Sequence, residues 1–255
     1  MLHSIIIPHR GRVAHLTLCL WSITESERQT GVTDYQIVLA HQGGAVPFSV
    51  PRLWVLHLPD DGGTFNKPKL LNAAIDAARG QLVTFLDCDA LVAPAFLAAA
   101  TQARDRRITR LCYRVRKLPS DWLPVLSAMP DRELRHMLGL AFDRYDDFPR
   151  AYEGYCNPDY NPPRPLPNQL VFGNSQFTCH RDALGDVRFH EHYAGHGFED
   201  LDFIWRLWKR HFVSYRGVLA DRVLFHFAHP YEPDWNNPDL TAANLARYRR
   251  TRHVL

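Results

Sequence analysis

The chain has 255 residues, 46% of them hydrophobic, and carries a formal net charge of +3 at pH 7. This length and composition support a sizeable buried core, which argues against wholesale disorder. The small net charge, with acids and bases interspersed, argues against a dedicated nucleic-acid binder, because such proteins carry a strongly basic patch.

The N-terminal part of the chain alternates between short apolar runs and segments with helical spacing, which is typical of parallel βαβ units. The predicted strands cover 3–9, 35–42, 53–59 and 81–89, and the predicted helices cover 13–26, 67–80 and 94–105. Gly80 is predicted to stop the second helix. The strands are apolar without alternation, which favours a sheet that is covered on both faces.

This pattern breaks between about 109 and 169. A strand within 110–119 and a helix within 130–145 are predicted there, followed by the proline-rich stretch YCNPDYNPPRPLPNQ. Such a long irregular loop inside a compact domain tends to be functional. Regular structure is predicted to resume over 169–184, with a helix over 199–211, a strand over 223–230 and a basic-ended helix over 239–255.

The cysteines are scattered, odd in number and without CxxC spacing, which argues against a disulfide framework or a zinc cluster. They are Cys19, Cys88, Cys112, Cys156 and Cys179. The N-terminal stretch MLHSIIIPHRGR is interpreted as a first strand and not as a signal peptide. No apolar stretch approaches the ~20 residues that span a bilayer. We therefore expect a soluble, cytoplasmic protein, and a peripheral membrane contact stays open.

Two acids end the strand predicted over 81–89. Asp87 and Asp89 follow the apolar run VTFL with only Cys88 between them. Because side chains alternate along a strand, both carboxylates are expected to point to the same face. Burying such charges is costly unless they are paired, and Mg²⁺ and Mn²⁺ prefer carboxylate and phosphate oxygens. The pair indicates either a divalent metal that holds a diphosphate or a solvated acidic turn.

The stretch GHGFEDLDF supplies further carboxylates at the start of a predicted helix. Gly195 and Gly197 make a pliable loop, and Glu199 and Asp200 follow it. Negative charge is favoured at a helix N-terminus, so these acids are explained equally well as a helix cap. The alternative is a positioned carboxylate that removes a proton from a hydroxyl, and the glycines favour it because a lid needs such freedom.

Two histidines close the last predicted strand, in FHFAHP. His226 falls at the strand end, and His229 follows at a turn before Pro230. Neutral imidazole is a common metal ligand, although a lone histidine is more often structural. Of the two, His226 is favoured as a ligand over His229.

These motifs, in this order, resemble those of the β-1,4-galactosyltransferase family and, more broadly, of nucleotide-sugar-dependent transferases of the GT-A fold. The resemblance lies in PHRGRVAHL, FNKPKLLNAAI, FLDCDALV, FGNSQFTCHRDAL with GHGFEDLDFIWRL, and FHFAHP. It covers roughly half of the chain and leaves about 109–169 unmatched. It implies one α/β, GT-A-like domain over 1–255, with a mixed, mostly parallel sheet flanked by helices. Its parts would be a nucleotide-sugar half (1–108), a variable insertion (109–170) and an acceptor and metal half (171–255).

The resemblance also implies an activity, that of a metal-dependent, inverting glycosyltransferase (a hexosyltransferase). Its donor would be a UDP-sugar and its acceptor a carbohydrate or glycoconjugate. The residues implied in donor binding are Pro8, His9, Arg10, Arg12, Lys67 and Asp87. Asp89 and His226 would bind Mn²⁺ or Mg²⁺, and Asp200 would be the catalytic base. The residues implied in acceptor binding are Glu199, Gly197 and His196.

Two departures from the family pattern leave the sugar and the acceptor open. His196 replaces the family's loop tryptophan, and Phe198 stands where the family has glycine. The loop from Tyr152 to Pro167 is expected either to stack on an acceptor sugar or to pack as a surface loop.

Other functions stay open as alternatives. One is a retaining or family-2-like transferase with another nucleotide sugar, and a second is a non-catalytic module that binds a nucleotide sugar or glycan. A third is a zinc hydrolase built on His190, His192 and His196, although their spacing fits no standard helix motif. Tightly bound zinc would favour the hydrolase, and loosely bound Mn²⁺ the transferase.

Overall fold

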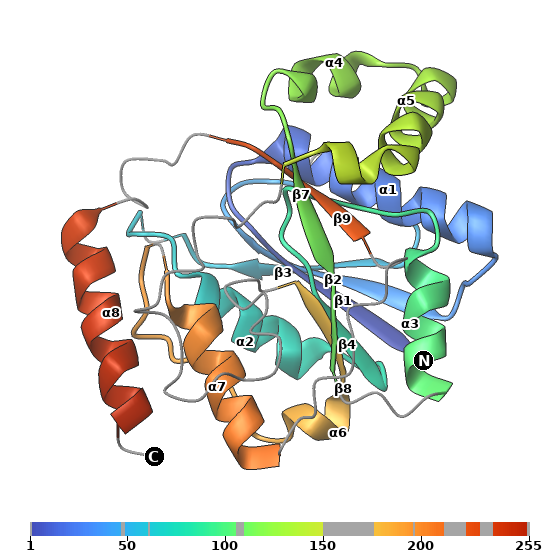
Figure 1. The fold of residues 1–255 in the computed structure, drawn as a ribbon. Helices are drawn as coiled ribbons and strands as arrows, with labels where there is room; N and C mark the ends of the chain where they lie inside the picture. Colours follow the sequence, from blue (N-terminus) through green and yellow to red (C-terminus); the bar gives the residue numbers. More distant parts are fainter. Residues whose placement is uncertain are drawn as a thin grey trace.

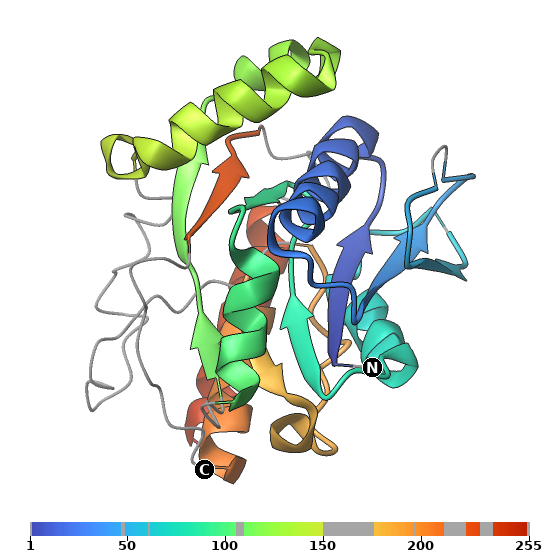
Figure 2. The ribbon, with the colours of Figure 1, turned by 90° about the vertical axis from the view of Figure 1, so that its right-hand side faces the viewer.

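Two β-sheets lie at the centre of the molecule (Figures 1 and 2). The computed structural model describes residues 2–46, 49–60, 62–105, 110–149, 176–195, 197–211, 223–229 and 237–253. The larger sheet has six strands in the order β3-β2-β1-β4-β8-β6, and the smaller has three in the order β5-β9-β7. The strands are β1 (His3–His9), β2 (Tyr35–Gln42), β3 (Leu53–Leu58), β4 (Leu82–Phe85), β5 (Ala90–Val92), β6 (Arg110–Cys112), β7 (Arg114–Leu118), β8 (Phe177–His180) and β9 (Val223–Phe227).

Helices follow several of these strands along the chain. They are α1 (Val13–Thr30), α2 (Lys67–Ala77), α3 (Phe96–Asp105), α4 (Trp122–Ala128), α5 (Asp131–Asp143), α6 (Arg181–Leu184), α7 (Glu199–His211) and α8 (Pro238–His253), with a 3₁₀ turn, η1 (Tyr145–Asp147). No helix within the described ranges is long and apolar enough to cross a membrane.

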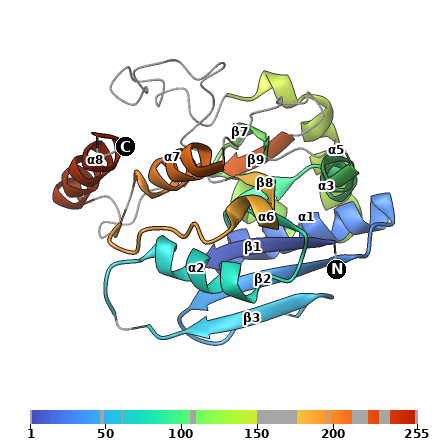
Figure 3. The same cartoon turned by 90° about the horizontal axis from the view of Figure 1, so that it is seen from below.

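The larger sheet is mostly parallel and covered on both faces, as predicted. Strands β3, β2, β1 and β4 are parallel, and β8 pairs antiparallel with β4. Figure 3 shows β1, β2 and β3 side by side. Successive residues of β1 point to opposite faces, and both faces are buried. Ile5 and Ile7 pack with side chains of α1 and α3, whereas Ile6 packs with side chains of α2 and α7. This double cover explains why the strands are apolar without alternation.

Gly80 has a different role from the predicted helix stop. Helix α2 already ends at Ala77, and Ala78 is extended. A Cβ at Gly80 would lie 2.5 Å from the backbone nitrogen of Ser4, so only glycine fits where the chain passes β1.

The strand predicted over 81–89 ends earlier than expected. Strand β4 stops at Phe85, and a turn closed by a hydrogen bond from Ala90 N to Asp87 O (3.1 Å) leads into β5 of the smaller sheet. Asp87 and Asp89 therefore lie in the link between the two sheets and not on one strand face. They face different partners, as described below.

The segment between 110 and 149 contributes to both sheets. Strand β6 extends the larger sheet beyond β8, and β7 pairs in parallel with β9 in the smaller one. Helices α4 and α5 cover the smaller sheet, where Leu126 and Leu138 pack in one cluster with Phe225 and Phe227. The proline-rich stretch, including the loop from Tyr152 to Pro167, lies outside the described residues.

Candidate functional site

An open pocket lies at the carboxyl ends of β1 and β4, where open α/β sheets bind their ligands. Its empty volume is about 580 Å³, a figure that includes open solvent. It is lined by Pro8, Arg10, Arg12, Phe65, Lys67, Asp87, Cys88, Asp89 and His226. The fold thus brings together five of the six residues that were predicted to bind a donor.

The sixth residue, His9, lies behind this wall. It is buried, and its Nδ1 lies 2.9 Å from Nδ1 of His41, on which its ring stacks. Phe65, in contrast, lines the pocket although it was not among the predicted site residues. Arg10 lies over its ring at 5.3 Å and donates a hydrogen bond to Gly63 O (2.8 Å). The quoted segment FNKPKLLNAAI begins with Phe65, so its position before α2 was the available signal.

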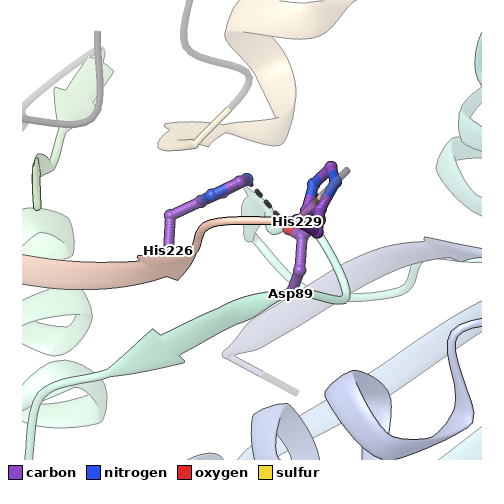
Figure 4. Close-up of side chains that lie close together, drawn as sticks. All are labelled: Asp89, His226 and His229. Carbon is purple, nitrogen blue, oxygen red and sulfur yellow. Dashed lines mark ion pairs between the residues drawn. The ribbon is translucent and has the colours of Figure 1, made fainter. Parts of the chain in front are cut away.

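A carboxylate and two imidazoles meet at one side of the pocket (Figure 4). The Nε2 atom of His226 lies 3.2 Å from Asp89 Oδ1, and that of His229 lies 3.0 Å from Asp89 Oδ2. Strand β9 sets this geometry, because its pairing with β5 puts His226 opposite Ala90, next to Asp89. We call Asp89, His226 and His229 the Asp–His–His cluster.

Arg12 is the fourth partner in the Asp–His–His cluster. Its NH1 atom donates to Asp89 Oδ2 at 2.7 Å and lies 2.9 Å from His229 Nε2. Burial alone would raise the pKa of Asp89, but His226, His229 and Arg12 outweigh burial and hold that pKa well below its usual range. Asp89 in turn raises the pKa of His226 against the effect of burial. The cluster is therefore a buried anion surrounded by cationic and hydrogen-bonding groups.

The donor atoms of the Asp–His–His cluster fit a transition-metal ion. They lie within 4.8 Å of one another, and the buried Asp89 Oδ1 accepts no hydrogen bond among the described residues. Imidazole with carboxylate suits Mn²⁺ or Zn²⁺, whereas Mg²⁺ prefers oxygen ligands alone. The set therefore fits Mn²⁺ better than Mg²⁺. The structure places His229 as close to Asp89 as His226, although the sequence favoured His226.

Asp87 faces a different cation, Lys67, which is buried between three carboxylates. The Nζ atom of Lys67 lies 2.9 Å from Asp87 Oδ1, 3.4 Å from Asp200 Oδ2 and 4.0 Å from Glu199 Oε1. Burial, together with the charges of Glu199 and Asp87, outweighs Lys67 and raises the pKa of Asp200 to about 8. Burial likewise raises the pKa of Glu199. Lys67 thus links the pocket to the start of α7.

The residue before these acids has an unusual backbone. Phe198 has a φ of 74°, in the left-handed region, directly after Gly197 with a φ of 99°. A bulky residue seldom adopts this conformation, and such strain concentrates at functional sites. Packing holds it in place, because Phe198 is 6% exposed and lies in one cluster with Tyr193 and Tyr248 of α8. Phe198 therefore holds a backbone conformation that favours glycine, and Glu199 and Asp200 follow it directly.

The histidines of HEHYAGH do not form a comparable site in the part of the chain that the structure describes. There, the Asp–His–His cluster is the one group of side chains that could hold a metal. His190 instead lies 3.9 Å from the buried carboxylate of Asp202. His196 lies outside the described residues.

No family model matches the chain, and a search of curated proteins finds no similar sequence. Solved structures do match. S. aureus TarS residues 1–349 with UDP superposes with a TM-score of 0.60 and 15% identity, covering 100% of this chain and 65% of that one. The same protein with UDP-GlcNAc gives a TM-score of 0.58 and 15% identity over 93% of this chain and 61% of that one. This chain therefore spans less than two thirds of the length of these structures.

TarS is a GT-A-like glycosyltransferase, so the likeness shows that this chain has the fold of that enzyme class. It gives no support to the narrower resemblance to β-1,4-galactosyltransferases.

Proposed function

We propose that this chain is a glycosyltransferase that moves a sugar from a UDP-sugar to a hydroxyl of a carbohydrate or glycoconjugate acceptor. The observation that carries the proposal is the composition of one pocket in a GT-A fold. Its wall carries Arg10, Arg12, Asp89 and His226, and Lys67 connects it to the buried carboxylate of Asp200. The UDP and UDP-GlcNAc complexes of TarS support the class of donor.

The basic residues of the pocket suit the diphosphate of such a donor. Arg10 and Arg12 carry planar guanidinium groups, which bind phosphate oxygens through paired N–H donors. Pro8 and Phe65 supply apolar wall beside them. Most of the ligand pockets of proteins combine such apolar lining with a few charged groups.

We propose that Asp89, His226 and His229 hold a divalent metal, with Mn²⁺ favoured by the donor set. When bound, such an ion neutralises the charge that develops on the departing diphosphate. The burial of Asp89 limits the screening of that charge by bulk water.

Asp200 is proposed as the general base of an inverting reaction. Its carboxylate takes the proton of the acceptor hydroxyl, and that oxygen forms a bond to the anomeric carbon. The bond from the anomeric carbon to the phosphate oxygen breaks on the opposite side, and its electron pair leaves with UDP. The raised pKa makes the Asp200 carboxylate a stronger proton acceptor than an ordinary aspartate. Glu199, Gly197 and His196 stay proposed acceptor contacts.

A screen across nucleotide sugars with Mn²⁺, with free UDP as the readout, tests this function. We expect one or more UDP-sugars to release UDP, faster when the acceptor is present. Donor binding without turnover would instead identify a non-catalytic module, and release of another nucleotide would correct the donor class. The anomeric configuration of the product, measured by NMR, separates inversion from retention.

The activity is expected to depend on pH through Asp200. The base must be ionised, so kcat/KM for the donor should rise with pH and level off above about 8, the raised pKa of Asp200. The negative charge of Glu199 contributes to this raised value. Glu199→Gln should therefore move the inflection to lower pH. A profile that is flat between pH 6 and 9 would contradict the assignment of Asp200.

The two histidines of the cluster are expected to contribute unequally to metal binding. Loss of an outer partner of a metal ligand costs ~10–100-fold in metal affinity. His226→Ala removes a proposed ligand itself, so it should weaken Mn²⁺ binding by at least as much. His229→Ala should have the smaller effect, because His229 Nε2 already has a hydrogen bond from Arg12 to give up. Calorimetric titration with Mn²⁺ measures both, and a larger loss at His229 would reverse this order.

A further inference from the structure

Arg12 occupies the position that a metal in the Asp–His–His cluster would need. Its NH1 atom lies 2.7 Å from Asp89 Oδ2 and 2.9 Å from His229 Nε2, so it contacts two of the three residues of the cluster. The ion pair is largely withdrawn from solvent, with side-chain exposures of 15% for Arg12 and 5% for Asp89. The Arg12 guanidinium is therefore a cation that lies among the side chains of the Asp–His–His cluster.

Arginine and a metal cannot use these atoms in the same way at once. A guanidinium has only N–H donors and no lone pair to offer a metal, and its NH1 atom lies 2.9 Å from His229 Nε2. A metal bound by Asp89 and His229 would take the place beside both side chains that NH1 now occupies, and its charge would repel the guanidinium. Arginine keeps its proton in proteins, so the conflict can be resolved only by moving the side chain.

We propose that Arg12 is an intramolecular counter-ion that fills the Asp–His–His cluster without metal and is displaced when a divalent ion binds. This rests on the metal dependence in the proposed function. It adds that Arg12 competes with the metal for the cluster. It also adds that metal binding releases the Arg12 guanidinium, which lines the donor pocket. Metal and nucleotide diphosphate should then favour each other's binding, since linkage between two sites is reciprocal.

Mn²⁺ titration without nucleotide, followed by the EPR signal of free Mn²⁺, tests this competition. Arg12→Met should bind Mn²⁺ about tenfold or more tightly than the wild type, because an internal competitor lowers apparent affinity by the fraction of sites that it fills. Arg10→Met is the matched control. It removes the same charge from the same pocket. Arg10 donates a hydrogen bond to Gly63 O and lies over the ring of Phe65, away from the cluster. It should change the affinity by less than about threefold.

An equal gain in Arg10→Met and Arg12→Met would overturn the proposal, because it would show general charge repulsion only. Unchanged or weaker binding in Arg12→Met would overturn it as well, and so would a lack of Mn²⁺ binding in both the wild type and Arg12→Met. Arg12→Lys keeps the positive charge beside Asp89, so it tests the competition in a variant that is expected to fold. Lysine carries a single ammonium group in place of the planar guanidinium, and the variant should bind Mn²⁺ with intermediate affinity.

Thermal melting gives a second readout that needs no substrate. Without metal, Arg12→Met leaves the buried Asp89 short of a cation and should melt below the wild type, whereas added Mn²⁺ should stabilise it by the larger shift. Equal Mn²⁺ shifts in the two proteins would count against the competition. Because neither measurement involves a sugar donor, a chain that fails to turn over UDP-sugars can still pass both, and an active one can fail both.

Discussion

Asp200→Asn is expected to lower the rate of sugar transfer by about two to four orders of magnitude, the usual contribution of a positioned general base. The amide keeps the shape of the side chain but cannot accept a proton at neutral pH. Donor and metal affinity should stay close to wild type, because Asp200 contacts Lys67 and lies outside the Asp–His–His cluster. Transfer at saturating donor, together with calorimetric UDP binding, measures both effects.

Asp202→Asn is the matched control for this experiment. It removes a carboxylate from the same first turn of α7, where Asp202 is buried and accepts a hydrogen bond from Arg206 (2.9 Å). Once its folded fraction is known from melting, its specific activity should be near that of the wild type. If Asp200 only caps the helix, its own replacement should cost little, since asparagine caps about as well as aspartate. Near-normal sugar transfer by Asp200→Asn would therefore make Glu199 or Asp202 the candidate for the general base.

Asp89→Asn is expected to remove the Mn²⁺-dependent part of UDP binding and to lower transfer by roughly two orders of magnitude or more. The physical reason is that a metal supplies several kcal/mol of charge stabilisation to the transition state, and about 1.4 kcal/mol corresponds to a factor of ten. Asp89 is the only carboxylate of the Asp–His–His cluster, so asparagine leaves two imidazoles and an amide oxygen. Such a set attracts a divalent ion far less.

The control lies within the same protein, because UDP affinity can be measured with Mn²⁺ and with a chelator. The affinity without metal should be similar in Asp89→Asn and the wild type, and only the gain on adding Mn²⁺ should vanish. The variant should also melt at a lower temperature, since Arg12 loses its buried anionic partner. A full Mn²⁺-dependent gain in Asp89→Asn would remove Asp89 from the metal site.

Much of the fold could be predicted because apolar periodicity is local information. Helix α7 has the bounds that its pattern predicts, and β1 and β2 cover the predicted residues. The strand over 81–89 was predicted too long, because a run of apolar residues does not show where its hydrogen-bonded neighbours end. Strand β4 stops at Phe85, and the chain then turns toward the smaller sheet. Asp87 and Asp89 are close in sequence but face Lys67 and Arg12, respectively.

The details of the candidate site depend on contacts between distant segments, which a pattern of residue types does not contain. His229 was the less favoured of the two candidate ligands because it follows the strand at a turn before proline, whereas the structure places its Nε2 atom 3.0 Å from Asp89. Arg12 was predicted to contact the donor, and its basic character gave no sign of its bond to Asp89. Phe198 was seen as a departure from glycine, whereas its left-handed backbone became evident only in the structure.

The topology of the smaller sheet has a consequence for the order in which the molecule assembles. Arg12 and His229 lie 217 positions apart, and β9, near the end of the described chain, is the middle strand between β5 and β7. Pairings between such distant segments form slowly, because closing the long loop between them costs conformational entropy before the contact can stabilise it. During synthesis, the ligands around Asp89 are incomplete until that strand has left the ribosome and docked. The proposed affinity for a metal ion would thus be a late property of the nascent chain, and an ion bound there would favour molecules whose folding is finished.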